Sequence, residues 1–258
     1  MKVVIFAGGI GTRISEESHL RPKPMIEIGG KPILWHIMKI YSCYGYNDFI
    51  ICLGYKGYMI KEYFFNYFMH NSDITIELKD NKVEIHNSNA ENFKVTMIDT
   101  GLNTKTAGRL KRIQKHLNGE DFMLSYGDGL ADIDISKLLA FHNKHGKIAT
   151  VTAVQPVGRF GVMHIDDFAN VDIFNEKLQG DENWINGGFF VLKNEVFNEM
   201  PENADDLMWE ESVMLKLASK KELVAYQHKG FWKCMDAMRD KIELEDDWAS
   251  GRPKWKIW

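Results

Sequence analysis

The sequence of 258 residues has little of what marks several classes of protein. Its three cysteines, Cys43, Cys52 and Cys234, are odd in number and far apart, which predicts neither a disulfide framework nor a zinc site. It contains no apolar run of about 18 residues, the length that a membrane helix needs. Its formal net charge of −4 gives no basic surplus for nucleic acid. We therefore expect a protein of the reducing cytoplasm that binds neither nucleic acid nor membrane.

The rest of the composition is that of a folded globular protein. Hydrophobic residues make up 45% of the chain and charged residues 26%, which argues against disorder. The stretch 1–9 holds one basic residue and an apolar run too short for a signal peptide. No internal repeat and no linker rich in proline and glycine divides the chain. We therefore expect a single domain over residues 1–258, in which the pattern changes near residue 155.

Strand-like and helix-like patterns alternate up to about residue 155. Residues 2–7 form a continuous apolar run, as in a strand buried on both faces, and residues 31–44 carry apolar side chains at helical spacing. Such alternation predicts a mostly parallel sheet flanked by helices, with ligands bound outside the carboxyl ends of the strands. The predicted elements are strands at 2–7, 48–53, 94–98, 122–126 and 148–154, helices at 31–44, 57–68, 106–117 and 136–145, and a hairpin of 74–78 with 82–86.

Beyond residue 155 the predicted strands are shorter and are separated by turns. This pattern predicts a smaller, mixed α+β part. The segment 254–258 carries Trp255 and Trp258, which we expect to be exposed and to pack against another subunit. The predicted elements are strands at 161–165, 171–174, 189–192 and 222–227, and helices at 207–219 and 238–248.

A glycine-rich motif, Gly8-Gly9-Ile10-Gly11-Thr12-Arg13, follows the first predicted strand directly. Glycines adopt positive φ and let backbone N–H groups approach a phosphate closely, and the arginine adds a fork of donors suited to phosphate oxygens. The motif lacks the Gly-Lys-Ser/Thr ending of a P-loop, and Ile14 stands where the dinucleotide fingerprint has its third glycine. We interpret the motif as a phosphate-binding loop; the alternative is a glycine-rich turn with an incidental arginine.

Lys23 lies between Pro22 and Pro24. A backbone flanked in this way cannot join a helix interior, so the lysine is held on a stiff, extended segment. Phosphoryl and nucleotidyl transfer need a cation positioned in advance, because charge that develops in the transition state must be met without reorganisation. The alternative is a surface lysine in a proline turn.

Together with later motifs, these segments resemble the sugar-1-phosphate nucleotidyltransferases over nearly the whole chain. The N-terminal motifs are specific to the superfamily, and the later motifs resemble its cytidylyl branch. The resemblance implies a Rossmann-like, mostly parallel mixed sheet of the glycosyltransferase-A type. The later motifs are Gly29-Gly30-Lys31-Pro32, Asp99-Thr100-Gly101, Gly108 to Arg112, Tyr126 to Gly129, Gly158 to Gly161, Ile185 to Phe190, Gly230 to Trp232 and Pro253 to Lys256.

The reaction that the resemblance implies is transfer of CMP from CTP to α-D-glucose 1-phosphate, giving CDP-glucose and pyrophosphate. The sugar-phosphate oxygen would attack the α-phosphorus in line, so catalysis would rest on positioning and electrostatics rather than on a covalent enzyme intermediate. The resemblance also implies Mg²⁺ as cofactor, a homo-oligomer (a trimer or hexamer) and a role in lipopolysaccharide O-antigen synthesis. By the same resemblance, the single domain would consist of a nucleotide-binding half, about 1–155, and a half for sugar-phosphate binding and oligomer contacts, about 156–258.

The resemblance also assigns residues to the site. Two carboxylates, Asp128 and Asp236, would hold the metal, since Mg²⁺ needs only one or two carboxylates beside substrate phosphates. Their alternatives are a turn aspartate and a helix N-cap. The proline that follows Glu-Lys in the family is Leu178 here. The implied catalytic residues are Arg13, Lys23 and Asp128; the implied nucleotide contacts are Ala7, Gly8, Gly9, Gly11, Thr12, Arg13, Lys23, Thr106, Gly108, Arg109 and Asp128; and the implied sugar-phosphate contacts are Gly161, Glu176, Lys177, Asn186 and Gly187.

The choice of base is the least determined part of this prediction. Residues 106–108 align with the loop that approaches the base in the wider family, and Asp99 begins the stretch where many uridylyl and thymidylyl relatives carry glutamine. We expect backbone groups to read cytosine. A uridylyl- or thymidylyltransferase and a non-catalytic nucleotide sensor remain alternatives, whereas an NAD-dependent dehydrogenase is disfavoured by Ile14. We interpret His142 and His145 as one helix face rather than a ligand pair, and Asp134 as a helix cap.

Overall fold

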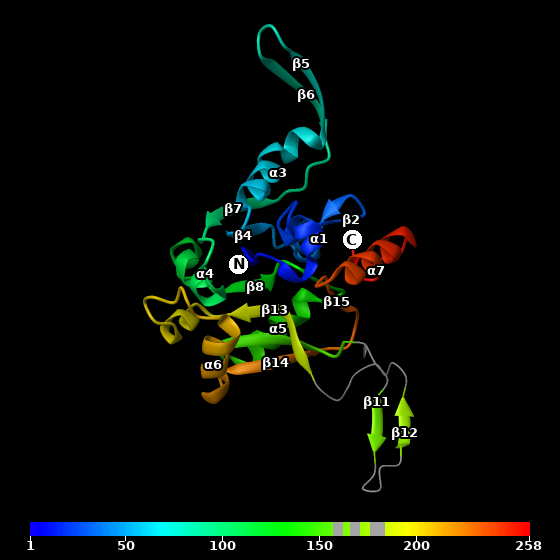
Figure 1. Cartoon of the computed structure of the whole chain (residues 1–258). Helices are drawn as coiled ribbons and strands as arrows, with labels where there is room; N and C mark the ends of the chain where they lie inside the picture. The colour runs from blue at the N-terminus through cyan, green and yellow to red at the C-terminus, as the bar shows by residue number, and fades with distance from the viewer. Residues whose placement is uncertain (157–161, 166–170, 176–183) are drawn as a thin grey trace.

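A mixed sheet of seven strands forms the centre of the protein, in the order β14-β10-β13-β8-β1-β4-β7. The computed structural model describes residues 1–156, 162–165, 171–175 and 184–258 (Figure 1). All strands of this sheet run parallel except β13, which is antiparallel to both of its neighbours. The predicted mostly parallel sheet is therefore confirmed. Its strands are β1 (Lys2–Ala7), β4 (Asp48–Leu53), β7 (Lys94–Asp99), β8 (Phe122–Tyr126), β10 (Ala149–Val154), β13 (Ile185–Leu192) and β14 (Leu223–His228).

Helices cover both faces of the sheet, as the continuous apolar strands require. In β1, Val3 and Ile5 belong to the hydrophobic cluster on the side of α2, α5 and α7, whereas Val4 and Phe6 belong to the cluster on the side of α4 and α6. Successive side chains of a strand point to opposite faces, so one strand serves both cores. The helices are α1 (Ser15–Ser18), α2 (Ile33–Ser42), α3 (Gly57–His70), α4 (Thr106–Ile113), α5 (Ile135–His145), α6 (Leu215–Ser219) and α7 (Met238–Ala249).

Several elements differ from the sequence prediction at their ends or in kind. The predicted helix 207–219 is a π-helical turn, Trp209–Met214, followed by α6, and the predicted helix 106–117 ends as a 3₁₀ turn, Gln114–Leu117. Two- and three-residue strands carry no detectable period, so the sequence did not predict them. These short pairs are β2 (Glu27–Ile28) with β3 (Lys31–Pro32) and β9 (Gly129–Ala131) with β15 (Trp232–Cys234). The hairpin predicted at 74–78 and 82–86 is present as β5 (Ser72–Glu77) with β6 (Lys82–Ser88), and the strands predicted at 161–165 and 171–174 are β11 (Val162–Ile165) with β12 (Val171–Asn175).

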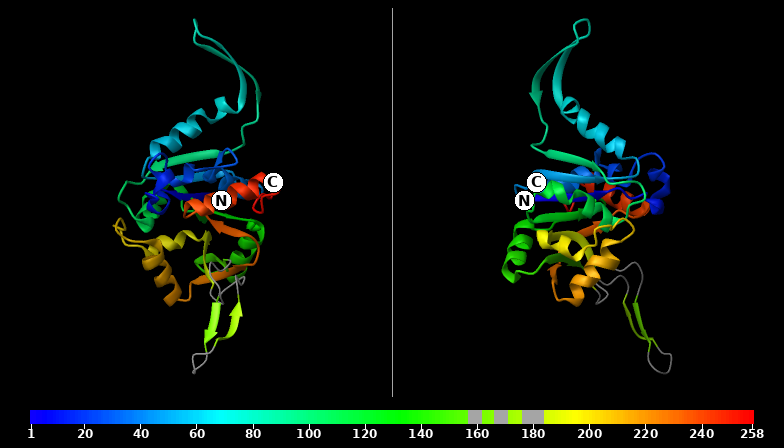
Figure 2. Two further views of the ribbon diagram at one scale, coloured as in Figure 1. Left: turned by 45° about the vertical axis from the view of Figure 1, so that its right-hand side comes forward. Right: turned by 90° about the vertical axis from the view of Figure 1, so that its left-hand side faces the viewer.

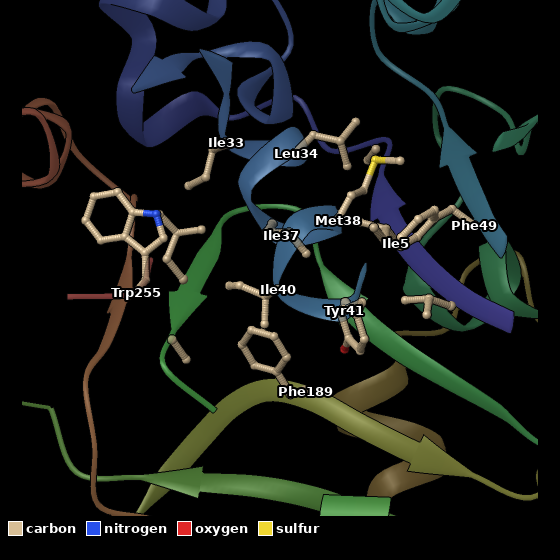
Figure 3. Packing of buried hydrophobic residues seen from close by; sticks show 14 of the residues in the cluster. Ile5, Ile33, Leu34, Ile37, Met38, Ile40, Tyr41, Phe49, Phe189 and Trp255 are labelled. Atoms are coloured by element: carbon tan, nitrogen blue, oxygen red, sulfur yellow. The ribbon is translucent and has the colours of Figure 1, made fainter. Parts of the chain in front are cut away.

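The expectation that Trp255 is exposed is wrong. Its side chain is fully buried in the chain's own core beside α2, as Figure 3 shows. Its indole nitrogen donates to Nδ1 of His36 at 3.4 Å, and its ring stacks on Trp248. Burial lowers the pKa of His36 to about 4, so this imidazole is neutral in the folded protein near neutral pH. Trp258 is partly buried and meets Trp35 edge to face.

Helix α3 and the β5–β6 hairpin form an arm that projects from the sheet (Figures 1 and 2). Every residue of β6 is exposed, so the hairpin has no core of its own. A two-stranded hairpin in water is marginally stable without such packing. None of the helices in the part of the chain described is both long and apolar enough to cross a bilayer. The large apolar side chains that the arm exposes include Phe65, Phe68, Ile76, Leu78, Val83 and Ile85.

Candidate active site

A cavity of about 480 Å³ opens where β1 and β8 end. These strands are parallel neighbours, so their carboxyl ends lie at the same edge of the sheet, where ligands of such folds bind. Because β13 runs antiparallel, its start reaches this edge too, and it brings Asn186 and Gly187 to the cavity. The predicted site residues that line the cavity are Ala7, Gly9, Gly11, Thr12, Arg13, Lys23, Thr106, Asp128, Asn186, Gly187 and Asp236.

The glycine-rich loop forms one wall of the cavity. At Gly11 the backbone has a φ of 71°, a left-handed conformation that most side chains disfavour. A Cβ at this position would lie 3.3 Å from the Cβ atoms of Lys23 and Ser18, so the loop also packs tightly there. The following 3₁₀ turn, Thr12–Ile14, leaves Arg13 exposed to the cavity. The local sequence therefore gives a loop whose backbone can approach a ligand.

Lys23 lies between two carboxylates that are distant in sequence. Its ammonium group is 2.6 Å from Oδ2 of Asp128 and 2.7 Å from Oδ1 of Asp236, and Arg13 lies 2.7 Å from the other oxygen of Asp236. Burial alone would lower the pKa of Lys23, but the charge of Asp128 and hydrogen bonds to both carboxylates raise it above its ordinary value. Burial would raise the pKa of Asp236, but Lys23 and Arg13 hold it below its ordinary value. Both Lys23 and Asp236 are therefore charged near neutral pH.

The two carboxylates fit a magnesium ion. Strand β15 pairs with β9 so that Cys234 lies opposite Gly129, which places Asp236 beside Asp128. Oxygen atoms of both carboxylates and the sulfur of Cys234 lie within 4.8 Å of one another. Mg²⁺ prefers carboxylate oxygen and has little affinity for thiols. Burial and the charge of Asp128 raise the pKa of the Cys234 thiol, so it is protonated at neutral pH.

The alternative that Asp236 caps the next helix does not hold. The N-cap of α7 is Ala237, and the carboxylate of Asp240 accepts the N–H groups of Asp236 and Ala237 at 3.0 and 2.9 Å. This leaves the Asp236 side chain directed at Lys23 and Arg13. Asp134, by contrast, is the helix cap that the sequence predicted, because its carboxylate accepts the N–H of Lys137.

Three predicted nucleotide contacts lie behind the cavity wall rather than in it. Arg109 is buried, and its guanidinium donates to the carbonyls of Gly8, Leu53 and Gly101 at 3.0, 3.0 and 2.8 Å. Gly8 contacts this guanidinium so closely that a Cβ there would lie 2.1 Å from Nη1. Gly108 packs on another segment, since its Cβ would lie 2.6 Å from the Cα of Asp205. In this structure Arg109 holds the glycine-rich loop through the carbonyl of Gly8, whereas Gly108 packs against the segment at Asp205.

The sugar-phosphate side is described only in part. Asn186 donates from Nδ2 to the hydroxyl of Tyr126 at 3.0 Å and accepts the N–H of Gly188 at 2.9 Å. The carbonyl of Gly187 accepts the indole N–H of Trp232 at 2.7 Å, and a Cβ at Gly187 would lie 2.8 Å from Val154. The remaining predicted contacts of this side, Gly161, Glu176 and Lys177, lie outside the described residues.

Among the groups at the cavity that the sequence did not assign to the site are Cys234, Trp232 and Glu210. Cys234 and Trp232 line it, and Glu210 accepts hydrogen bonds from two of its lining side chains. A signal existed for Cys234, because it lies two residues before Asp236 on a strand end, where alternate residues share a face. Nothing in the spacing marked Glu210, which lies in the π-helical turn. His142 and His145 both contact Thr150 Oγ1, as expected of a structural pair on one helix face.

Comparison with known proteins gives concordant results. The family model described as Nucleotidyl transferase matches residues 2–247. A glucose-1-phosphate cytidylyltransferase of Salmonella typhi is 51% identical over the whole length of both chains, and a probable glucose-1-phosphate cytidylyltransferase of Bacillus subtilis is 43% identical, also over both whole chains. The crystal structure of HddC from Yersinia pseudotuberculosis covers 96% of this chain and 99% of its own, with a TM-score of 0.67 and 26% identity.

Proposed function

The chain belongs to the nucleotidyl transferase family, and from this we propose that it transfers CMP from CTP to α-D-glucose 1-phosphate, giving CDP-glucose and pyrophosphate. The observation that carries the assignment of base and sugar is the full-length similarity to relatives named for that reaction. The cavity supports the reaction type, because it joins a glycine-rich loop, two cations and two carboxylates at one sheet edge.

The transfer needs no nucleophile from the protein. An oxygen of the sugar phosphate forms a bond to the α-phosphorus of CTP while the bond from that phosphorus to the bridging oxygen breaks, and pyrophosphate leaves with the electron pair. Negative charge spreads over the phosphoryl oxygens as this happens. Lys23 and Arg13 are already positioned at the cavity and can offset that charge. The N–H groups around Gly9 and Gly11 supply further donors from the loop.

Asp128 and Asp236 are the residues that would hold Mg²⁺. When bound, the ion would supply positive charge to the phosphates of the substrates. Lys23 would then turn its ammonium from the carboxylates toward phosphate oxygen, since its stem already lies in the cavity wall. On the other side of the cavity, Asn186 and Gly187 would contact the sugar phosphate together with Gly161, Glu176 and Lys177.

We further propose that the protein is a homo-oligomer, a trimer or hexamer, acting as one domain in the cytoplasm. The arm of α3, β5 and β6 supports this, because its exposed apolar side chains have no cover within the described chain. Equilibrium ultracentrifugation tests it, and a monomer at micromolar concentration would refute it. The product CDP-glucose would serve synthesis of lipopolysaccharide O-antigen sugars.

Pyrophosphate release tests the proposed reaction. The purified protein is incubated with glucose 1-phosphate and Mg²⁺, and separately with CTP, dTTP, UTP, ATP or GTP. Release confined largely to CTP is the expected result. Release with UTP or dTTP instead would keep the site but assign a sister specificity, and release with none of them would favour a nucleotide sensor. The Asp80→Asn variant, changed at an exposed hairpin turn far from the cavity, is the control for the site variants given below.

A further inference from the structure

The side chain of Glu210 lies directly behind the cavity wall and binds two of its lining residues. Its Oε2 accepts the hydroxyl of Thr106 at 3.0 Å, and its Oε1 accepts the hydroxyl of Tyr126. Both hydroxyl-bearing residues line the cavity, whereas Glu210 reaches it only through them. Glu210 belongs to a π-helical turn, a form that is rare in proteins and frequent at functional sites.

These contacts fix the direction of the hydrogen bonds along the wall. A hydroxyl has one hydrogen to donate, and Thr106 and Tyr126 both donate theirs to Glu210. Tyr126 can therefore only accept from Asn186, whose Nδ2 lies 3.0 Å away.

The chain of contacts continues from Tyr126 to the start of β13. Because Asn186 turns its amino group to Tyr126, its carbonyl oxygen faces the N–H of Gly188, which it accepts at 2.9 Å. The amide orientation of Asn186 is thus set, through Tyr126, by a carboxylate that does not line the cavity. The second hydroxyl bound by Glu210 is that of Thr106, which also accepts the N–H of Trp209 at 2.7 Å. Thr106 is thus left with one lone pair, with which it can accept a hydrogen bond from a ligand.

We propose that Glu210 is a positioning residue for nucleotidyl transfer, which holds Thr106 as an acceptor on one side of the cavity and orients Asn186 on the other. This inference rests on the proposed function. It predicts that the wall selects ligand groups that donate hydrogen bonds to Thr106. An amino group, such as N4 of cytosine, can do so, whereas the carbonyl that uracil carries at the same position cannot.

The variant Glu210→Gln tests this role with almost no change in volume. The glutamine amide has a donating NH₂ group in place of one accepting oxygen. The hydroxyl of either Thr106 or Tyr126 would therefore have to accept a hydrogen bond from residue 210 instead of donating one. Glu211→Gln is the matched control, because it makes the same change at the next residue, which is exposed. The readouts are kcat, the KM of each substrate, the ratio of kcat/KM for CTP to that for UTP, and the melting temperature.

For Glu210→Gln we expect kcat/KM with CTP to fall at least tenfold, with a higher KM for one or both substrates and a lower CTP/UTP ratio. Tyr126→Phe should raise the KM of the sugar phosphate, and adding Glu210→Gln to it should raise that KM little further, because the path to Asn186 is already cut. Glu211→Gln should match the unchanged protein in every readout.

The inference is overturned if Glu210→Gln keeps both KM values and the CTP/UTP ratio, even when its stability falls, since that outcome describes a purely structural carboxylate. Additive effects of Glu210→Gln and Tyr126→Phe on the sugar-phosphate KM would overturn it as well. Failure of the proposed function is a separate outcome, because the unchanged protein would then release no pyrophosphate. In that case calorimetric titration of CTP and UTP into the same variants decides the role of Glu210.

Discussion

Arg109 offers the sharpest test of how the glycine-rich loop is held. Its guanidinium donates to four main-chain carbonyls and to the hydroxyl of Thr100, and no cavity-lining role is evident from its position. The substitution Arg109→Met keeps most of the apolar stem and removes every donor. The change therefore isolates the hydrogen bonds from the packing.

The loss of stability in Arg109→Met depends on whether each carbonyl keeps another hydrogen-bond donor. Hydrogen bonds to a charged group contribute about 1.5–3 kcal/mol each. The carbonyl of Gly8 keeps the N–H of Tyr55, and that of Leu53 keeps the N–H of Thr100, so neither is left without a partner. Removing the buried charge also removes its desolvation penalty. We therefore expect a net loss of about 3–5 kcal/mol, as for breaking one side of a buried charged network.

Thermal unfolding and steady-state kinetics measure the outcome. For a chain of this size, each kcal/mol corresponds to roughly 2–4 °C, so Arg109→Met should melt roughly 10 °C lower. Its KM for CTP should rise because the loop loses its support. The control is Arg112→Met on the same helix. Its guanidinium forms an exposed ion pair with Asp205 and donates to the carbonyl of Thr100, so this variant should lose less stability than Arg109→Met. If Arg109→Met has the same melting temperature as this control, Arg109 does not hold the loop. A higher KM for CTP without a loss of stability would then favour direct contact between Arg109 and the nucleotide.

Three further predictions follow from the same geometry. Gly8→Ala would place a methyl group 2.1 Å from a guanidinium that is held by hydrogen bonds, so it should lower both stability and kcat/KM; unchanged kinetics would show that the loop can shift. Lys23→Ala and Asp128→Asn should each lower kcat about 10²-fold or more while the fold persists, which circular dichroism and pyrophosphate release check together; near-normal turnover in both would contradict the site. His36 has a folded pKa of about 4, below its ordinary value, so its contribution to stability is complete above about pH 6.5 and falls by about 1.4 kcal/mol per pH unit toward pH 4. Urea unfolding at pH 7 and pH 5 measures this slope. Burial also lowers the pKa of His142 to about 4, so the variant His36→Asn should reduce the slope by the contribution of one histidine and leave that of His142.

The sequence was sufficient to predict the central sheet, because its middle strands are buried on both faces and appear as continuous apolar runs. The strands predicted from apolar runs at 48–53 and 122–126 begin and end at the same residues in the structure. The antiparallel direction of β13 could not be predicted, since a run of apolar side chains carries no information on strand direction, and its start was missed because Gly187 and Gly188 interrupt the apolar pattern. That direction decides which residues reach the cavity, so pattern alone could not explain how Asn186 enters the site.

Within the site, the sequence identified residues whose chemistry is visible in their type and spacing. Lys23 between prolines and Asp128 at a strand end are of this kind, and the structure brings them together. It could not identify roles that depend on long-range contacts with the main chain. From sequence alone, Arg109 is part of an ordinary charged helix face, and only the structure shows the carbonyls that it binds. The position of Glu210 in the sequence gives no signal either, since its role depends on the contact with Tyr126.

The burial of Trp255 against α2 affects the order in which the protein can fold. Trp255 and His36 lie 219 residues apart in sequence, yet their side chains are hydrogen-bonded, and Trp255 shares one hydrophobic cluster with Val3 and Ile5 of β1. Ribosomes deliver a chain from its N-terminus, and contacts of such long range form late because a large loop must close first. The part of the core beside α2 that Trp255 covers therefore cannot close until Trp255 has been synthesised.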